Sequence, residues 1–201
     1  MECVTLGWPS DSVSIRLDYR LFSYAGKFIP TNTGKAVIRG PDAEHSIPDG
    51  IPAVPPSVDP SVFDHSVIAA VAFNADRTDP SRLWIRYVTV RSDRRGQALG
   101  PRLIMHVLSE AATHGYQIAV IAVNNPFAYH ALHKAGFAFT GDETGLAEVV
   151  LERPIDKPAK QTTRLYQRGL DRYRARGNLS QQERAFLKSK RNQGLPALVE
   201  Q

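Results

Sequence analysis

Residues 82–108, RLWIRYVTVRSDRRGQALGPRLIMHVL, carry the pattern from which the fold is predicted. Its first part, residues 83–90, is rich in β-branched and aromatic side chains and predicts a strand. From Pro101 onward, apolar residues recur at spacings of three and four until Gly115, which predicts an amphipathic helix. Pro101 suits the first turn of that helix and Gly115 suits the left-handed residue after its end. A short loop with two glycines therefore joins a strand directly to a helix.

Strand and helix patterns continue on both sides of this stretch. Residues 67–73 are apolar and largely β-branched or small, and they predict a strand that forms an antiparallel hairpin with residues 83–90. A fully apolar strand is predicted at 118–123, followed by a helix with Asn125 as its N-cap and Gly136 as its stop. Two closing strands are predicted at 137–140 and 146–151.

The N-terminal third carries weaker patterns. Residues 14–22 alternate between apolar and polar side chains and residues 35–39 form a short apolar run, so both predict strands. Residues 39–65 are crowded with prolines, which central strands and helices exclude. We therefore predict a long surface loop there.

Together these elements predict an α/β (α+β) fold. Alternation of strand and helix implies a central parallel strand pair, set in a mixed, mostly antiparallel twisted sheet with helices on both faces. We expect one domain over residues 1–153 and a basic helical extension over residues 154–201.

Composition narrows the class of protein. The chain has 201 residues, of which 42% are hydrophobic and 22% charged, as in globular proteins. No apolar run approaches the roughly 18 residues of a membrane span, and the start of the chain lacks a secretory pattern, so we expect a cytoplasmic protein. The single cysteine, Cys3, excludes an internal disulfide and a thiolate-rich metal site. We predict no metal.

The extension is basic. Residues 154–201 hold 11 basic and 4 acidic side chains, whereas the remainder of the chain is about neutral. Two helices are predicted at 162–176 and 181–192, with Ser180 and Glu183 at the spacing of a capping box. An apolar stripe within the first helix could dock the extension on the rest of the chain; it consists of Tyr166, Leu170 and Tyr173.

The loop at residues 95–101 has the chemistry of a phosphate site. A strand that ends in a glycine-containing loop and opens a helix directs several backbone N–H groups, and the positive end of the helix dipole, towards one point. Basic side chains around the loop add long-range attraction for an anion. These are Arg91, Arg94, Arg95 and Arg102.

The region also matches a known pattern. Residues 82–108, the apolar strand after them and the segment NNPFAYHALHKAGF at 124–137 resemble the GNAT acetyltransferase superfamily. Its signature is Gln or Arg, two residues, Gly, one residue, then Gly or Ala. Arg95 and Gly100 match this signature, whereas Ala98 stands where the first glycine is usual. Alanine there narrows the space beside a pyrophosphate but keeps the backbone N–H.

The resemblance implies a cosubstrate, acetyl-CoA, and a set of residues that binds it. The backbone of Val88, Thr89 and Val90 would pair with the pantetheine arm, and Asn125 would help to fix it where the two parallel strands separate. The pyrophosphate would be held by the loop residues Arg95, Gly96, Gln97, Ala98, Leu99 and Gly100. The implied reaction is direct attack of an acceptor amine on the acetyl thioester.

The sequence does not single out one residue as the acid that protonates the CoA thiolate. Family members often carry a tyrosine near the CoA sulfur, five residues before the phenylalanine of the GF dipeptide, where this chain has Leu132. Tyr129, about one helical turn earlier, is our preferred substitute as the acid, and His133 is the second choice; packing is the ordinary role of such residues. A thiolate can also leave without an acid.

The general base is not assigned. Family members often place a glutamate on the strand before the loop, where this chain has Arg86 and Tyr87. Tyr87 and Trp84 could equally be core residues or walls of an acceptor site. Conceivable bases near the proline-rich loop are Glu44, His45, Asp64 and His65.

Three functions stay open at this stage. The first is an N-acetyltransferase whose acceptor is a small amine, a peptide N-terminus, a protein lysine or an antibiotic. The second is a nucleic-acid-associated protein that binds phosphates through its basic extension. The third is a CoA-binding sensor without catalysis. The oligomeric state is not predicted.

Overall fold

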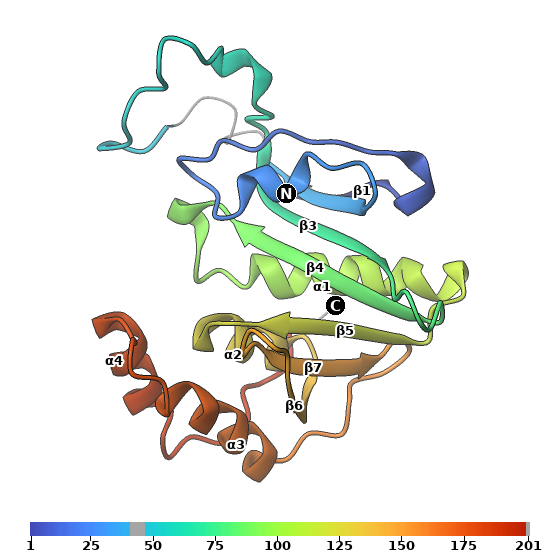
Figure 1. Ribbon diagram of the computed structural model, residues 1–201, viewed down its shortest axis with the longest axis vertical. Coiled ribbons are helices and arrows are strands. Elements are labelled where there is room, and N and C mark those ends of the chain that lie inside the picture. The colour runs from blue at the N-terminus through green and yellow to red at the C-terminus, as the bar shows by residue number, and fades with distance from the viewer. Residues whose placement is uncertain (41–46, 200–201) are drawn as a thin grey trace. The chain divides into compact units, whose positions relative to one another are not determined.

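The computed structural model describes residues 1–40 and 47–199 and shows strands and helices in mixed order (Figure 1). The strands are β1 (Glu2–Gly7), β2 (Gly34–Arg39), β3 (Val67–Ala75), β4 (Arg82–Val90), β5 (Ile118–Val123), β6 (Ala138–Glu143) and β7 (Val149–Pro154). The helices are α1 (Leu99–Ala111), α2 (Pro126–Lys134), α3 (Thr163–Arg174) and α4 (Gln181–Ser189).

The strands form one seven-stranded sheet in the order β1-β2-β3-β4-β5-β7-β6. β1 pairs antiparallel with β2, β2 with β3, β5 with β7 and β6 with β7. β4 and β5 are parallel neighbours. The predicted mixed sheet with a central parallel pair is therefore confirmed.

The chain divides into two compact units. The first comprises residues 1–75 and 85–107, and the second comprises residues 76–84 and 108–201. The start of β4 thus belongs to the second unit, where Ser81 O accepts hydrogen bonds from the N–H groups of Gln117 and Ile118 at 2.8 and 3.4 Å.

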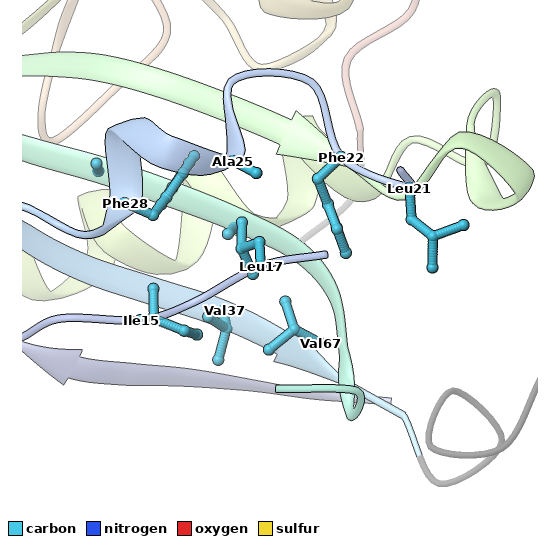
Figure 2. Packing of buried hydrophobic residues seen from close by; sticks show 10 residues of the cluster. Ile15, Leu17, Leu21, Phe22, Ala25, Phe28, Val37 and Val67 are labelled. Atoms are coloured by element: carbon cyan, nitrogen blue, oxygen red, sulfur yellow. The ribbon is translucent and has the colours of Figure 1, made fainter. Parts of the chain in front are cut away.

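The first unit packs its irregular N-terminal segment onto β2 and β3. Figure 2 shows Ile15, Leu17 and Phe28 beside Val37 and other side chains of this cluster. All four are buried, and Ile15 N donates to Phe28 O at 3.2 Å. The apolar side chains of this segment therefore supply a core layer without forming a strand.

One strand predicted for the N-terminal region is wrong, and one strand of that region was not predicted. Residues 14–22 form no strand; their alternation reflects burial of Ile15 and Leu17 from an irregular segment that leads to the 3-10 turn Ala25–Phe28. Residues 2–7, for which no strand was predicted, form β1, whose side chains are only half-buried and give little hydrophobic signal.

Lys35 on β2 stabilises the same segment. Its side chain is 0% exposed, and its Nζ donates to the carbonyl oxygens of Val13 and Pro30, both at 2.7 Å. Further contacts go to the carbonyl and the hydroxyl of Thr33, both at 3.0 Å. Burial lowers the pKa of this amine, but the ring of oxygen acceptors replaces the water it loses.

In the second unit the predicted helix signals are confirmed. Asn125 caps α2 by accepting a hydrogen bond from Ala128 N at 2.8 Å. Ser180 and Glu183 form the capping box of α4. α3 and α4, red in Figure 1, pack against α2, and α3 also packs against β6. The docking role predicted for the stripe is confirmed, because Tyr166, Leu170 and Tyr173 are all 0% exposed.

Candidate acyl-CoA site

The loop after β4 has the backbone shape of an anion cradle. Gly96 and Ala98 have φ angles of 83° and 57°, with Gln97 between them. Left-handed residues within a turn bring neighbouring N–H groups to the same side and form a concave anion-binding nest. α1 starts at Leu99, and the N–H groups of a helix's first turn have no acceptor within the helix. The loop can therefore donate several hydrogen bonds to one anion.

Gly100 lies against the end of β4. A Cβ atom at this position would lie 3.5 Å from Val88 Cγ1 and 3.7 Å from Val90 Cγ2. An alanine side chain would fit at these distances, whereas a large one would displace the two valines. The structure thus brings together three of the predicted binding residues, Val88, Val90 and Gly100, within the first unit.

The arginines around the cradle differ in their surroundings. Arg91 is 1% exposed and its Nε lies 2.9 Å from Asp93 Oδ1. Arg94 Nε lies 3.6 Å from the other oxygen of Asp93. This carboxylate offsets part of the positive charge, so Arg95 and Arg102, both exposed, are the cations best placed to attract an anion from solution.

Arg95 also connects the cradle to the N-terminal segment. Its guanidinium donates to Ser23 Oγ at 3.0 Å and, through Nε, to Val90 O at 3.4 Å. The backbone supports the same connection, because Ser92 N donates to Leu21 O at 2.9 Å. Side-chain and backbone hydrogen bonds therefore connect the N-terminal segment to the loop that forms the cradle.

Thr89 is the remaining predicted binding residue on β4. It is 4% exposed, and its Oγ1 has no hydrogen-bond partner within residues 1–40 and 47–199. The expected pairing of Val88 to Val90 with pantetheine stays a prediction.

Asn125, Tyr129 and His133 lie in the second unit. The side-chain oxygen of Asn125 caps α2, which leaves its amide nitrogen as the donor; this nitrogen lies 3.4 Å from Asn124 Oδ1. A contact of Asn125 with pantetheine stays a prediction.

Tyr129 is enclosed by α3. Its side chain is 0% exposed, its hydroxyl donates to Tyr166 O at 3.1 Å, and its ring stacks on that of Tyr166 with centroids 5.7 Å apart. Burial raises the pKa of the Tyr129 hydroxyl well above its usual range. A buried phenol whose proton is already donated is a poor acid, so the structure favours packing, and the proton-transfer role stays a prediction.

His133 is held as a neutral ring. It is 1% exposed, and its Nδ1 lies 3.0 Å from Gln161 Oε1 while Gln161 Nε2 donates to His133 O at 3.1 Å. Burial lowers the pKa of His133 to about 4. The acceptor at Nδ1 selects the tautomer protonated there. A neutral histidine has no readily released proton for a thiolate at neutral pH, and this role also stays a prediction.

Asp64 and His65, two of the conceivable bases, are engaged by other groups of the chain. Asp64 forms an ion pair with Arg39 at 2.8 Å, and its Oδ1 accepts from Ser66 Oγ at 2.7 Å. His65 Nε2 lies 3.0 Å from Pro60 O. Glu44 and His45 fall outside the described residues.

The aromatic residues of β4 have separate surroundings. The ring centroids of Tyr87 and the exposed Tyr24 lie 6.1 Å apart, and Lys27 Nζ lies 5.8 Å from the centroid of the Tyr87 ring. Trp84 Nε1 donates to Asp76 in the second unit. Tyr87 also packs against the core of the first unit.

The basic extension contains two kinds of cations. Arg174, Arg176 and Lys190 are half-buried and bond to atoms of the chain itself. The remaining cations of α3 and α4 are exposed, as is Arg191, two residues after α4 ends; those within the helices are Arg164, Arg168, Arg172, Arg184 and Lys188. Because they recur at spacings of three and four within each helix, each helix carries a row of positive charge.

Across residues 1–40 and 47–199, no helix is long and apolar enough to cross a membrane. Within the same residues, the structure contains no group of three or more His, Cys, Asp or Glu side chains that could hold a metal ion.

Comparison with solved structures finds acetyltransferases. Nourseothricin acetyltransferase is 16% identical over 77% of this chain and 98% of its own, with a TM-score of 0.48. An N-acetyltransferase from Staphylococcus aureus Mu50 is 15% identical over 61% and 68% of the two chains, with a TM-score of 0.44. Aminoglycoside 6'-acetyltransferase type Ii is 13% identical over 64% and 72%, with a TM-score of 0.43.

A search of the curated proteins found no match. Residues 55–137, however, match the model of the acetyltransferase (GNAT) family. This segment contains β3, β4, the cradle, α1, β5 and α2. The central part of the chain is therefore similar to the GNAT acetyltransferase family.

Proposed function

We propose that this protein transfers the acetyl group of acetyl-CoA to an amine acceptor. One observation carries the proposal: the family match at residues 55–137 includes a strand-to-helix loop with two left-handed residues, Gly96 and Ala98. A diphosphate needs several converging donors, and such a loop at a helix N-terminus supplies them. The residues present therefore fit the diphosphate of CoA.

Acetyl-CoA supplies an acetyl group already activated as a thioester. The lone pair of the acceptor nitrogen forms the new C–N bond, the C–S bond breaks, and the electron pair leaves with the CoA thiolate. The acceptor loses one proton and the thiolate gains one, so the products are an amide and free CoA.

The chain's own part is to bind and to orient. The cradle would hold the diphosphate through the N–H groups of residues 96–100, and Val88 to Val90 would align the pantetheine arm. Because Tyr129 and His133 lack an available proton, we propose that water protonates the thiolate. A thiolate is stable enough in water to leave without a dedicated acid.

Calorimetric titration of acetyl-CoA tests the cradle. We expect stoichiometric binding by the wild type and its loss in Gly100→Trp, whose side chain would displace Val88 and Val90. Gly177→Trp is the matched control, because a Cβ atom at Gly177 meets nothing within 4 Å. Circular dichroism checks that each variant is folded. A folded wild type that does not bind acetyl-CoA would contradict the proposal.

A screen of amine acceptors then tests turnover. We expect amide formation with at least one amine, and a kcat for Tyr129→Phe within about twofold of the wild type. A general acid contributes about 10²-fold or more, so a loss of that size would restore Tyr129 as the acid. Tight acetyl-CoA binding without turnover of any amine would instead favour a CoA sensor.

A further inference from the structure

α3 carries a row of arginines on the face opposite its buried side. Arg164, Arg168 and Arg172 follow one another at intervals of four residues, and all three are exposed. On an ideal helix each interval of four residues advances about 6 Å, so the row runs about 12 Å along one face. Tyr166, which is 0% exposed, lies about 160° around the helix from Arg168. The arginine row of α3 therefore faces solvent.

α4 carries a second row of cations. Arg184 and Lys188 are four residues apart and exposed, and Arg191, also exposed, follows two residues after the helix ends. Leu187 of the same helix is 3% exposed, so α4 turns its apolar side inwards and its cations outwards. α3 and α4 pack against each other within the second unit. One pair of packed helices therefore presents both rows.

The acidic side chains of these helices are held by other groups. α3 contains one acid, Asp171, whose Oδ1 accepts a hydrogen bond from Arg174 Nη1 at 2.7 Å. α4 contains one acid, Glu183, which belongs to the capping box of that helix. Glu143 on β6 lies 3.3 Å from Arg172 Nε and offsets part of its charge. Most of the positive charge of the two rows therefore stays available to a partner.

The rows complement a polyanion with regularly spaced charges. Double-stranded nucleic acid carries one negative charge per about 1.7 Å of its axis, so a row of about 12 Å would run beside roughly seven phosphates. Guanidinium groups bind phosphate oxygens in a bidentate geometry, and five of the six cations in the rows are arginines. Both the spacing and the type of cation therefore suit a phosphate backbone.

The same helices offer little to unstacked bases or to lipid. Proteins that bind single strands stack the bases on accessible aromatic rings, but Tyr166 and Tyr173 are 0% exposed, and Phe186 packs against Phe127 with ring centroids 4.7 Å apart. A helix that lies on a membrane inserts apolar side chains into it, whereas the apolar stripe of α3 is buried in the protein. A duplex is the polyanion that these faces fit best.

We propose that the outward faces of α3 and α4 bind double-stranded nucleic acid through its phosphates, without reading its sequence. Sequence is read by side chains that reach base edges within a groove, whereas cations on the outside of two helices contact the backbone. Every residue of this surface lies in the basic extension, so binding here requires neither the cradle nor acetyl-CoA. Release of counterions from the phosphates makes the affinity fall steeply with salt.

Fluorescence anisotropy with a labelled duplex DNA of random sequence, titrated with the full chain at several salt concentrations, tests this surface. We expect Arg164→Gln with Arg168→Gln to weaken binding by more than about 10-fold at ~0.1 M salt. This variant should also lower the slope of log K against log salt by about 2, because each lost phosphate contact removes about 0.9. Arg164→Lys with Arg168→Lys keeps both charges and should retain the slope.

Arg16→Gln with Arg77→Gln is the matched control. Both residues are exposed, both lie outside the extension, and the variant loses the same net charge. We expect its slope to stay that of the wild type. Circular dichroism checks that each variant is folded, and glutamine is a good helix former at exposed positions. Equal losses of affinity in the two glutamine variants would overturn the proposal, as would a wild type that binds no duplex at low salt.

Competition against the labelled duplex tests the chemistry of the partner. Unlabelled duplex should compete better than single-stranded DNA, poly-glutamate, or vesicles of phosphatidylserine and phosphatidylcholine, all compared at equal negative charge. Better competition by the single strand would overturn the assignment to a duplex. Equal competition by poly-glutamate or by the vesicles would overturn the assignment to nucleic acid.

Discussion

At the scale of single residues, Ala98 carries backbone strain within the cradle. Its φ of 57° is unfavourable for a side chain with a Cβ atom, by about 1–2 kcal/mol. Glycine removes this strain but loses roughly 0.4–1 kcal/mol through the greater freedom of the unfolded chain. We expect Ala98→Gly to raise the free energy of unfolding by about 0.5–1 kcal/mol, measured by denaturant titration.

Ala147 provides the control for this prediction. It has nearly the same φ, 58°, but lies in the turn between β6 and β7. Ala147→Gly should give a similar gain in stability. A loss of stability in both variants would show that neither backbone position is strained.

At the scale of elements, the docking of α3 depends on the absence of a side chain at Gly169. A Cβ atom there would lie 2.0 Å from the Tyr129 hydroxyl and 2.4 Å from its Cζ. The ring of Tyr129 is buried and cannot swing away, so overpacking should cost about 1–3 kcal/mol in Gly169→Ala. Helix propensity alone predicts the opposite sign, a gain of about 0.5–1 kcal/mol.

Thermal unfolding of Gly169→Ala and Gly100→Ala checks this. Gly100 is also helical, and the nearest atoms to its added Cβ are 3.5 Å away, so its variant should be as stable as the wild type or more so. A stabilised Gly169→Ala would contradict the close packing of α3 on α2.

The interface between α2 and α3 should also respond to pH. Burial lowers the pKa of His133 from 6.5 to about 4, so the unfolded chain binds a proton at a higher pH than the folded chain does. The neutral ring therefore contributes to the free energy of unfolding above pH 6.5. This contribution, about 3 kcal/mol at most, is lost as the pH falls towards 4.

A second histidine of α2 titrates in the same range. Burial lowers the pKa of His130 to about 4, with further lowering by Lys190, Lys134 and His133. The ring of His133 itself contacts Gln161 and Tyr166. We expect His133→Gln to flatten the fall in melting temperature between pH 7 and pH 4.5. An unchanged pH dependence would exclude His133 as its source.

Local patterns predicted most elements, because short-range periodicity and caps are read directly from sequence. β5 and the cap at Asn125 are confirmed for this reason. The strand predicted around Ile15 and Leu17 is wrong because alternate residues of an irregular segment are buried there, with the same two-residue period as in a strand. The stripe on α3 predicted docking, but the bond from Tyr173 to Val123 spans 50 residues and leaves no local signal.

At the scale of the whole molecule, the extension is integrated with the second unit. A division after residue 153 stays a prediction, and α3 and α4 bury Tyr166, Leu170, Tyr173 and Leu187. Each contributes about 1.5–3 kcal/mol, a sum comparable with the whole stability of a typical domain. We expect a chain truncated after Pro154 to lose its cooperative thermal transition in near-ultraviolet circular dichroism.

A truncated chain that melts cooperatively near the wild-type temperature would contradict this expectation.

Truncation is a poor test of nucleic-acid binding, because it would unfold the chain as well as remove its positive charge. Reversal of exposed cations, such as Arg164→Glu with Arg168→Glu and Arg184→Glu, keeps the buried stripe. Salt-dependent retention of the full chain on a polyanionic resin that is lost in this variant would support the nucleic-acid alternative.

The buried amine of Lys35 has a further consequence if the protein acts on acetyl-CoA as proposed. An acylating reagent reacts with neutral, accessible amines, whereas this amine is enclosed and donates to carbonyl oxygens on several sides. Exposed lysines such as Lys27 and Lys188 should become acetylated by excess acetyl-CoA long before it does. Acetylated Lys35, detected by mass spectrometry, would therefore show that the N-terminal segment had opened. The rate at which it accumulates would report the rate of this local unfolding.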